Sequence, residues 1–330
     1  MNKEYAQAVE VSPPLPARES PQGESPRWGI IYSPKTGVLH SHKKWEKIRR
    51  KLNEEGIEYD FVQSESNGSE ERLGAMLAKN GYKTIVVVGG DGALNRAVQG
   101  ALTALPEAAA KGTNDITFGV IPNGHGNDYA RFWDIPEDDP LKAVDVLIRR
   151  RIRKVDVGVL REGDREHFFL NCMNVGVAAS IVNIKHKTYR FWGLSSLSYL
   201  SSFFLMLFHR MEHRARLVVN HETLDGSFMN ICVGNAHGYG LTPNAVPYNG
   251  MLDVTTVSHP AISQLLAGMY MLVTGRFLSH RNVRPYRSRQ KIRFEEIGTA
   301  CVSLDGLVLQ HPTLPMQVSV RQEWIRFIIP

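Results

Sequence analysis

The apolar positions along the first half of the chain fall into two alternating patterns. A short run of apolar, β-branched residues at 84–88 predicts a strand that is buried on both faces, and we expect further strands at 29–32, 57–62 and 116–121. Between them, apolar residues recur at helical spacing and predict helices over 41–54, 69–80 and 93–105, with Ser69 capping the second. Strands that alternate with helices predict a doubly wound α/β domain with a parallel sheet.

The pattern changes after Arg153, where short strand-like runs dominate. They predict strands at 155–160, 167–174, 215–220, 227–233, 252–257, 291–295, 299–304 and 317–320. Two longer apolar segments, 191–208 and 262–277, predict helices within this β-rich second domain. We therefore expect a disordered, proline-rich tail over 1–26, an α/β domain over 27–152 that 318–330 could complete, and a β-rich domain over 153–317.

Composition narrows the class of protein but not its function. Of the 330 residues, 43% are hydrophobic and 22% charged, which is ordinary for a globular protein with a sizeable core. The net charge of +6 is compatible with anionic substrates, anionic lipid surfaces or nucleic acid, and favours none of them. The cysteines lack metal-site spacing, serines interrupt the apolar segment 191–208, and no signal-peptide pattern is present, so we expect a cytoplasmic protein.

A glycine-rich turn, Gly89-Gly90-Asp91-Gly92, follows the strand at 84–88 and opens the next helix. Its three glycines leave the backbone open to a ligand, and the N-terminus of the following helix favours phosphate. The alternative is an ordinary strand–turn–helix connection with a surface aspartate. Two further loops, beginning at Ser33 and Pro122, also follow predicted parallel strands. All three should meet at one edge of the sheet, which favours the phosphate interpretation.

These motifs, in this order, resemble the diacylglycerol kinase catalytic-domain family, which includes bacterial lipid kinases and sphingosine and ceramide kinases and is distantly related to NAD kinases. The resemblance rests on GGDG-x-LN at 89–95 and on PNGHGNDYAR at 122–131. Segments at 33–37, 154–158, 171–176, 234–254 and 303–306 are also similar to the family's motifs, so the resemblance covers roughly 28–330.

The resemblance implies a nucleotide cleft between the α/β domain and a β-sandwich domain, with ATP and Mg²⁺ as cofactors. The residues that it implies for the nucleotide are Ser33, Gly37, Gly89, Gly90, Gly92, Asn95, Gly124, His125, Asn127 and Arg131. Asp128, Asp156 and Asp305 are the implied magnesium ligands, and the metal would neutralise charge during phosphoryl transfer. Either Asp305 or Asp91 would accept the proton of the attacking hydroxyl.

The acceptor implied by the resemblance is a lipid alcohol, either diacylglycerol or a sphingoid-type lipid. The apolar segments 191–208 and 262–277 could line an acyl-chain pocket or simply pack the core of the second domain. A lipid substrate requires peripheral association with a membrane, for which the basic runs 43–51 and 149–154 are candidates, although the second run is also typical of a solvated helix end. We expect no nucleic-acid partner and leave a homodimer open.

Three departures from the family pattern bear on activity. Arg96 stands where a glutamate follows the asparagine, His125 where the loop has threonine, and Leu307 where the closing DGE motif has its glutamate. Loss of a metal carboxylate at 307 leaves open a nucleotide-binding protein of the same fold that no longer transfers phosphate. An NAD kinase is the second alternative. Arg96 could itself bind a phosphate oxygen.

Overall fold

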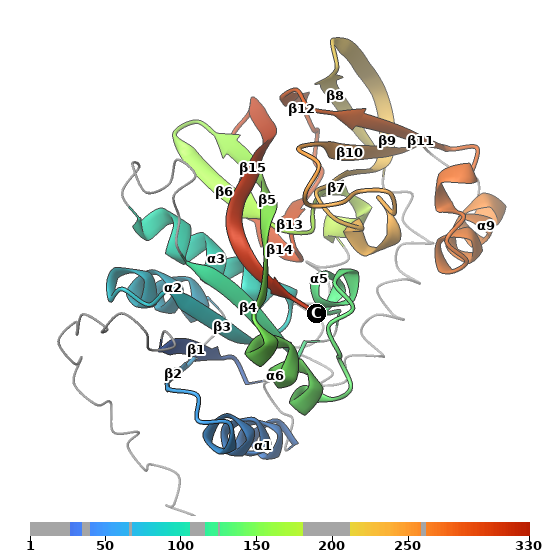
Figure 1. Ribbon diagram of the computed structural model, residues 1–330. Helices are drawn as coiled ribbons and strands as arrows, with labels where there is room; N and C mark the ends of the chain where they lie inside the picture. The colour runs from blue at the N-terminus through green and yellow to red at the C-terminus, as the bar shows by residue number, and fades with distance from the viewer. Residues whose placement is uncertain are drawn as a thin grey trace, which may run out of the picture.

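Parallel strands in the order β4-β3-β1-β2 form the sheet of the first domain (Figure 1). The computed structural model describes residues 27–34, 40–65, 68–105, 116–124, 126–180, 212–258 and 262–330. The expected tail at 1–26 and the apolar segment 191–208 lie outside these residues. The strands are β1 (Trp28–Tyr32), β2 (Tyr59–Gln63), β3 (Thr84–Gly89) and β4 (Thr117–Pro122).

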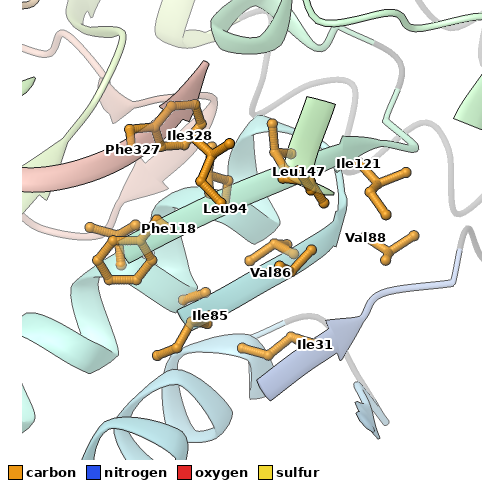
Figure 2. Packing of buried hydrophobic residues seen from close by; sticks show 14 of the residues in the cluster. Ile31, Ile85, Val86, Val88, Leu94, Phe118, Ile121, Leu147, Phe327 and Ile328 are labelled. Carbon is orange, nitrogen blue, oxygen red and sulfur yellow. The ribbon is translucent and has the colours of Figure 1, made fainter. Parts of the chain in front are cut away.

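Helices cover both faces of this sheet. On one face α2 (Ser69–Lys79) contacts α3 (Asp91–Ala104), and on the other α1 (His40–Glu54) contacts α6 (Pro140–Arg149). Strands β1, β3 and β4 are buried along their whole length, which agrees with their unbroken apolar runs. Figure 2 shows the resulting core, where Ile31, Val86 and Phe118 lie among apolar side chains of the helices and of the closing strand. The predicted α/β class is confirmed.

The second domain is built from antiparallel strands. They are β5 (Arg151–Glu162), β6 (Arg165–Phe169), β7 (Cys172–Gly176), β8 (His213–Val219), β9 (Glu222–Gly234), β10 (Leu252–Ser258), β11 (Val283–Ser288), β12 (Ile292–Glu296), β13 (Val302–Leu304) and β14 (Leu307–Leu309). Their alternating inward side chains form a separate apolar core. Short helices complete the domain: α9 (Ile262–Val273), η1 (Gly238–Gly240) and η2 (Phe277–Ser279).

The last strand, β15 (Met316–Ile329), connects the two domains. It pairs antiparallel with β12 and along the length of β5, and its end runs parallel to β4, with Arg326 opposite Thr117. The described strands therefore form one continuous path of pairing through both domains. This shared strand joins the two domains, since it pairs with the first residues of β4 in the parallel sheet and with β5 and β12 in the antiparallel part.

Three local predictions were wrong. The single strand expected at 167–174 is interrupted between Phe169 and Cys172, because the intervening backbone turns its N–H groups toward a carboxylate of another segment. The basic run 149–154 does not simply end a helix, since β5 begins at Arg151. Ser69 is the first residue of α2 rather than its cap, a position that Gly68 takes. Among the described residues, no helix has the length and apolar character needed to cross a membrane.

Candidate active site

The turns that follow β3 and β4 touch through their glycine backbones. A β-carbon added at Gly90 would lie 2.8 Å from the Gly124 Cα, and one added at Gly124 would lie 2.4 Å from the Gly90 Cα. The N–H of Asn123 donates to the Gly89 carbonyl at 2.8 Å, which continues the strand pairing into the turn. Only glycine permits this approach. The third predicted loop is adjacent, since a β-carbon at Gly89 would lie 3.4 Å from the Ser33 Cβ.

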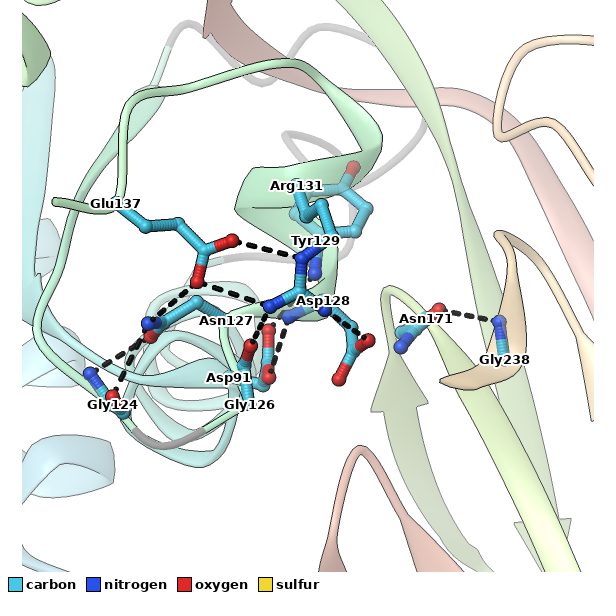
Figure 3. A network of polar contacts seen from close by, with 10 residues as sticks. All are labelled: Asp91, Gly124, Gly126, Asn127, Asp128, Tyr129, Arg131, Glu137, Asn171 and Gly238. Carbon is cyan, nitrogen blue, oxygen red and sulfur yellow. Dashed lines mark hydrogen bonds and ion pairs between the residues drawn. The ribbon is translucent and has the colours of Figure 1, made fainter. Parts of the chain in front are cut away.

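Asp91 holds the start of the neighbouring short helix α5 (Asp128–Phe132). Its two carboxylate oxygens accept hydrogen bonds from the backbone N–H groups of Asp128 and Tyr129, both at 3.0 Å (Figure 3). Burial raises the pKa of Asp91, and these two N–H groups act in the opposite direction. Sequence reasoning placed Asp91 at a phosphate turn. The structure adds that this aspartate fixes the second loop against the first.

Asp128 lies beside Asp91 and has one carboxylate oxygen without a hydrogen bond in the described part of the chain. Its Oδ1 accepts from Arg131 at 3.1 Å, and Arg131 also donates to Glu137 at 2.9 Å. Burial, together with the negative charge of Asp91, raises the pKa of Asp128 to about 6. Because no described residue donates to Oδ2, this oxygen is open to a cation or to a proton donor.

Asn127 closes its own loop rather than pointing away from it. The side-chain oxygen accepts from the Gly124 N–H at 2.8 Å, while the amide nitrogen donates to the Gly124 carbonyl and to Glu137, both at 3.2 Å. The residue has a positive φ of 54°, a conformation that asparagine tolerates better than most residues. Asn127 thus keeps the glycine turn in place. Two other predicted nucleotide residues, Gly37 and His125, lie outside the described residues.

Asp305 is buried at the junction of the domains and is surrounded by donors. Its carboxylate accepts from the backbone N–H groups of Leu170, Asn171 and Cys172 at 2.7–2.9 Å and from the Asn95 amide at 3.0 Å. Burial raises the pKa of Asp305 to about 6, against the opposing effect of these donors. Each oxygen accepts two bonds, so all four lone-pair positions are occupied. Asn95, predicted to contact nucleotide, uses its amide to join α3 to this carboxylate and to the Phe168 carbonyl.

The predicted magnesium ligands are not gathered into one cluster. Asp156 is fully buried, and its oxygens accept from the backbone N–H groups of Gly250 at 2.7 Å and Glu323 at 2.8 Å. Asp305 is occupied as described above. Within the ranges that the structure describes, no group of three or more His, Cys, Asp or Glu is arranged to hold a metal. Asp128 is the one predicted ligand with an oxygen that accepts no hydrogen bond from described residues.

Tyr239 is a candidate that sequence reasoning missed. A β-carbon built at Gly126 would lie 3.0 Å from Asp128 Oδ2, 3.1 Å from Asp91 Oδ2 and 3.9 Å from the Tyr239 ring, so the three side chains border one spot. The phenol oxygen also lies 3.4 Å from the β-carbon position of Gly306. Burial raises the pKa of Tyr239 strongly, and the nearby carboxylates raise it further. Its positive φ of 56° is rare for an aromatic residue and is typical of functional sites.

Asn171 holds the turn that carries Tyr239. Its side-chain oxygen accepts from the Gly238 N–H at 2.9 Å, and its buried amide nitrogen has no partner among the described residues. The family-like segment at 171–176 contained this residue, but a single sequence gave no reason to select it. A buried donor without a partner is uncommon and points to a ligand or a water molecule.

Two of the three residues that depart from the family pattern, Leu307 and Arg96, lie in the described part of the chain. Leu307 lies over the beginning of α3, with its Cδ2 3.1 Å from the β-carbon position of Gly92. Arg96 lies 3.9 Å from the buried carboxylate of Glu70. The same carboxylate accepts from the Ser33 hydroxyl at 2.8 Å and from the Gly68 N–H at 3.1 Å. Arg96 is therefore paired with an acid at the edge of the Ser33 loop.

Comparison with known proteins covers nearly the whole of the described chain. Residues 27–160 match the family model of the diacylglycerol kinase catalytic domain, and residues 171–329 match the YegS C-terminal NAD kinase beta sandwich-like domain. A diacylglycerol kinase of Bacillus subtilis is 24% identical over 84% of this chain and 88% of its own length. A Xanthomonas oryzae protein named "Probable lipid kinase YegS-like" is 29% identical over 68% of this chain and 72% of its own.

Solved structures share the arrangement of the two domains. A diacylglycerol kinase structure from Bacillus anthracis superposes with a TM-score of 0.69 at 19% identity, covering 92% of this chain and 97% of the other. At this identity the likeness shows a common fold. The predicted β-sandwich-like second domain is confirmed by the second family model.

Proposed function

The chain belongs to the diacylglycerol kinase catalytic-domain family, and we propose that it is an ATP- and Mg²⁺-dependent kinase that phosphorylates a lipid alcohol. One observation carries the proposal. The two glycine turns at 89–92 and 124–126 touch each other, and the adjacent carboxylates of Asp91 and Asp128 border the same spot as Tyr239 of the second domain. Glycine turns that suit phosphate and carboxylates that suit proton acceptance thus border one small region.

The donor side of this region suits the phosphates of a nucleotide. The turn backbones at Gly90 and Gly124 carry no side chains, and α3 begins at Asp91, directly after the first turn. Free N–H groups and the positive end of the helix dipole stabilise negative charge at such a position. Ser33 adds a hydroxyl at the margin, held in place by Glu70. We assign the β- and γ-phosphates to the two turns.

The carboxylates fit a magnesium ion that is shared with phosphates. Mg²⁺ prefers oxygen ligands and is bound in nucleotide sites by one or two carboxylates together with phosphate oxygens and water. Asp128 offers such an oxygen, and Asp91 lies beside it. A bound Mg²⁺ would offset the repulsion between two neighbouring carboxylates and the charge that develops during phosphoryl transfer. Leu307 supplies no ligand, so we expect the metal to rely on Asp128 and the phosphates.

The transfer requires a carboxylate that accepts a proton. The lipid hydroxyl oxygen forms a bond to the γ-phosphorus, the bond between that phosphorus and the β,γ-bridging oxygen breaks, and ADP leaves while the hydroxyl proton passes to a carboxylate. A raised pKa suits this role: burial raises the pKa of Asp305 to about 6 and also raises the pKa of Asp91. Asp305 must first give up one of its four donors. Asp91 needs no such rearrangement, and Asp128 is assigned to the metal, which favours Asp91 as the proton acceptor.

The acceptor is a diacylglycerol or a sphingoid-type lipid, presented at the surface of a membrane in the cytoplasm. The names of the relatives support a lipid acceptor without selecting one. Phosphorylation of NAD is a second candidate, since the family model for residues 171–329 is named for a domain like that of NAD kinases. A nucleotide-binding protein without turnover is the third, because of Leu307 and Arg96.

A single labelling experiment separates these candidates. Purified protein is incubated with radiolabelled ATP and Mg²⁺ and, separately, with mixed micelles of diacylglycerol, sphingosine or ceramide, or with NAD. We expect label in a lipid and none in NAD. Asp128→Asn should remove most of the turnover while ATP still raises Tm. Label in NAD alone would replace the lipid kinase proposal, and nucleotide binding without label in any acceptor would identify the third candidate.

A further inference from the structure

Helix α9 is apolar in sequence, yet it lies at the margin of the second domain (Figure 1). Its residues, ISQLLAGMYMLV, include no charged side chain. Tyr270 is 69% exposed, and Ala267 and Thr274 are exposed on the same helical face. A helix without a polar face is usually buried or lies against a membrane. The exposed tyrosine shows that within the described chain nothing covers this face.

The opposite face of α9 packs against the rest of the second domain. Leu272 packs against the small apolar cluster of Val257, Phe277 and Val283, and Gly268 is buried against His280. Helix η2 contacts both α9 and β11. The outward direction of Tyr270 is therefore fixed by packing, and the helix cannot rotate its exposed face into the core.

The charged residues in the stretch of chain around α9 are all basic. From residue 254 to residue 294 the chain has no aspartate or glutamate and has seven basic residues, Arg276, Arg281, Arg284, Arg287, Arg289, Lys291 and Arg293. Arg287 and Arg293 pair with acids outside this stretch. Arg276, Arg281 and Arg284 are exposed and form no ion pair with described residues. Three exposed cations without an acidic partner among the described residues thus lie on or directly beside η2 and β11, the elements that pack against Leu272 of α9.

We propose that Tyr270, Arg276, Arg281 and Arg284, the α9 surface, dock the protein onto a membrane that contains anionic lipid. Tyrosine is suited to the headgroup region, and arginine pairs with lipid phosphates. Each basic side chain near an anionic bilayer contributes about 1 kcal/mol, a contribution that salt weakens. A second copy of this chain is disfavoured as the occupant, because a two-fold contact would place like charges against each other.

The packed face of helix α9 contacts the segment that carries Tyr239 of the candidate active site. A β-carbon at Gly240 would lie 3.2 Å from the Leu272 side chain, and the preceding residue is Tyr239, which borders the carboxylates. Docking through α9 would bring this region close to the bilayer. The inference that the partner is a membrane rests on the proposed lipid kinase function. The inference that α9 forms a binding surface rests on the exposure of its residues and on the charges near it. The basic runs 43–51 and 149–154, predicted earlier, are alternative surfaces.

Vesicle sedimentation without nucleotide tests the surface. The probes are vesicles of phosphatidylcholine alone and of phosphatidylcholine with phosphatidylglycerol, at low and high salt. We expect wild type to sediment with the anionic vesicles at low salt. The double variant Arg281→Ala/Arg284→Ala should bind roughly 30-fold more weakly, and Tyr270→Ala roughly tenfold more weakly. The matched control Lys47→Ala/Arg50→Ala removes two exposed basic residues of α1 and should bind like wild type.

The outcomes separate failure of this inference from failure of the proposed function. Weak binding by the control together with normal binding by the α9 variants would overturn the α9 surface and assign docking to α1. A wild-type dimer that Tyr270→Ala converts to a monomer would overturn it in favour of a self-interface. Kinase activity is read separately, with short-chain diacylglycerol in detergent micelles. We expect the α9 variants to keep that activity and to lose activity toward vesicles. Vesicle binding without any lipid phosphorylation would refute the function and keep the surface.

Discussion

Replacing Gly124 by alanine tests whether the nucleotide lies at the two glycine turns. The added β-carbon would lie 2.4 Å from the Gly90 Cα and 2.6 Å from the Asn127 side-chain oxygen. Neither neighbour can yield easily, because one is backbone and the other accepts the Gly124 N–H at 2.8 Å. Carbon atoms in contact require about 3.5 Å or more, so the turns must separate by roughly 1 Å.

The size of the effect follows from this separation. Overpacking of this kind costs about 1–3 kcal/mol, which lowers Tm by roughly 1–4 °C in a protein of this length. ATP with Mg²⁺ at about 100 times its Kd should stabilise the wild type by about 2.7 kcal/mol. If the phosphates contact both turns, the variant should lose at least about tenfold in affinity, which removes about 1.4 kcal/mol of that stabilisation.

The assay is thermal unfolding with and without ATP and Mg²⁺, for wild type and for two alanine variants. Gly226→Ala in β9 is the matched control, since the nearest atoms to its β-carbon position are ring carbons of Phe228 at 3.8 Å. The control should keep the wild-type Tm increase. A folded Gly124→Ala variant with an undiminished nucleotide-induced increase would refute the reasoning and place the nucleotide elsewhere.

Two further changes test the carboxylates. The pKa of Asp128 is raised from 3.8 to about 6 by burial and by Asp91, so the folded state keeps a proton that the unfolded chain releases. The contribution of Asp128 to the free energy of unfolding therefore declines as pH rises between these two values. Urea unfolding of Asp128→Asn should show a smaller decline over this pH range than wild type. An unchanged pH dependence would contradict the assignment. Residue 307 faces the start of α3 near Gly92, so the variant Leu307→Glu would place a carboxylate there. We expect this variant to need less Mg²⁺ for half-maximal turnover. An unchanged Mg²⁺ requirement would show that position 307 does not reach the metal.

Local patterns predicted the first domain well because its signals are local. The runs at 84–88 and 116–121 are apolar without interruption, and the corresponding strands β3 and β4 are buried throughout. The meeting of the loops after these strands follows from parallel topology alone. The same reasoning misjudged 167–174, because the break after Phe169 depends on a carboxylate that is more than 130 residues away in sequence.

The candidate site was predicted as a set of residue types, but not as a set of contacts. Asp91, Asp128 and Asp305 were selected by their motifs, whereas their hydrogen-bond partners come from tertiary structure. Tyr239 had no such signal, since an isolated tyrosine between glycines is unremarkable until the domains are brought together. A motif identifies which chemistry is available. Only the packing determines which of its oxygens are already occupied.

Positions 96 and 307, where this chain departs from the family pattern, have different surroundings. At position 96 a basic residue stands where the family has an acid, but Glu70 of the adjacent helix brings a buried carboxylate to within 3.9 Å of Arg96. The same carboxylate of Glu70 accepts a hydrogen bond from the Ser33 hydroxyl at 2.8 Å. Position 307 has an apolar side chain, and Leu307 packs over Gly92 at the start of α3. If the nucleotide and the metal lie where we propose, Arg96 is balanced by Glu70 at the margin of the nucleotide, whereas Leu307 removes a ligand on the metal side. We therefore expect a difference from related kinases to appear in the magnesium dependence before the nucleotide affinity.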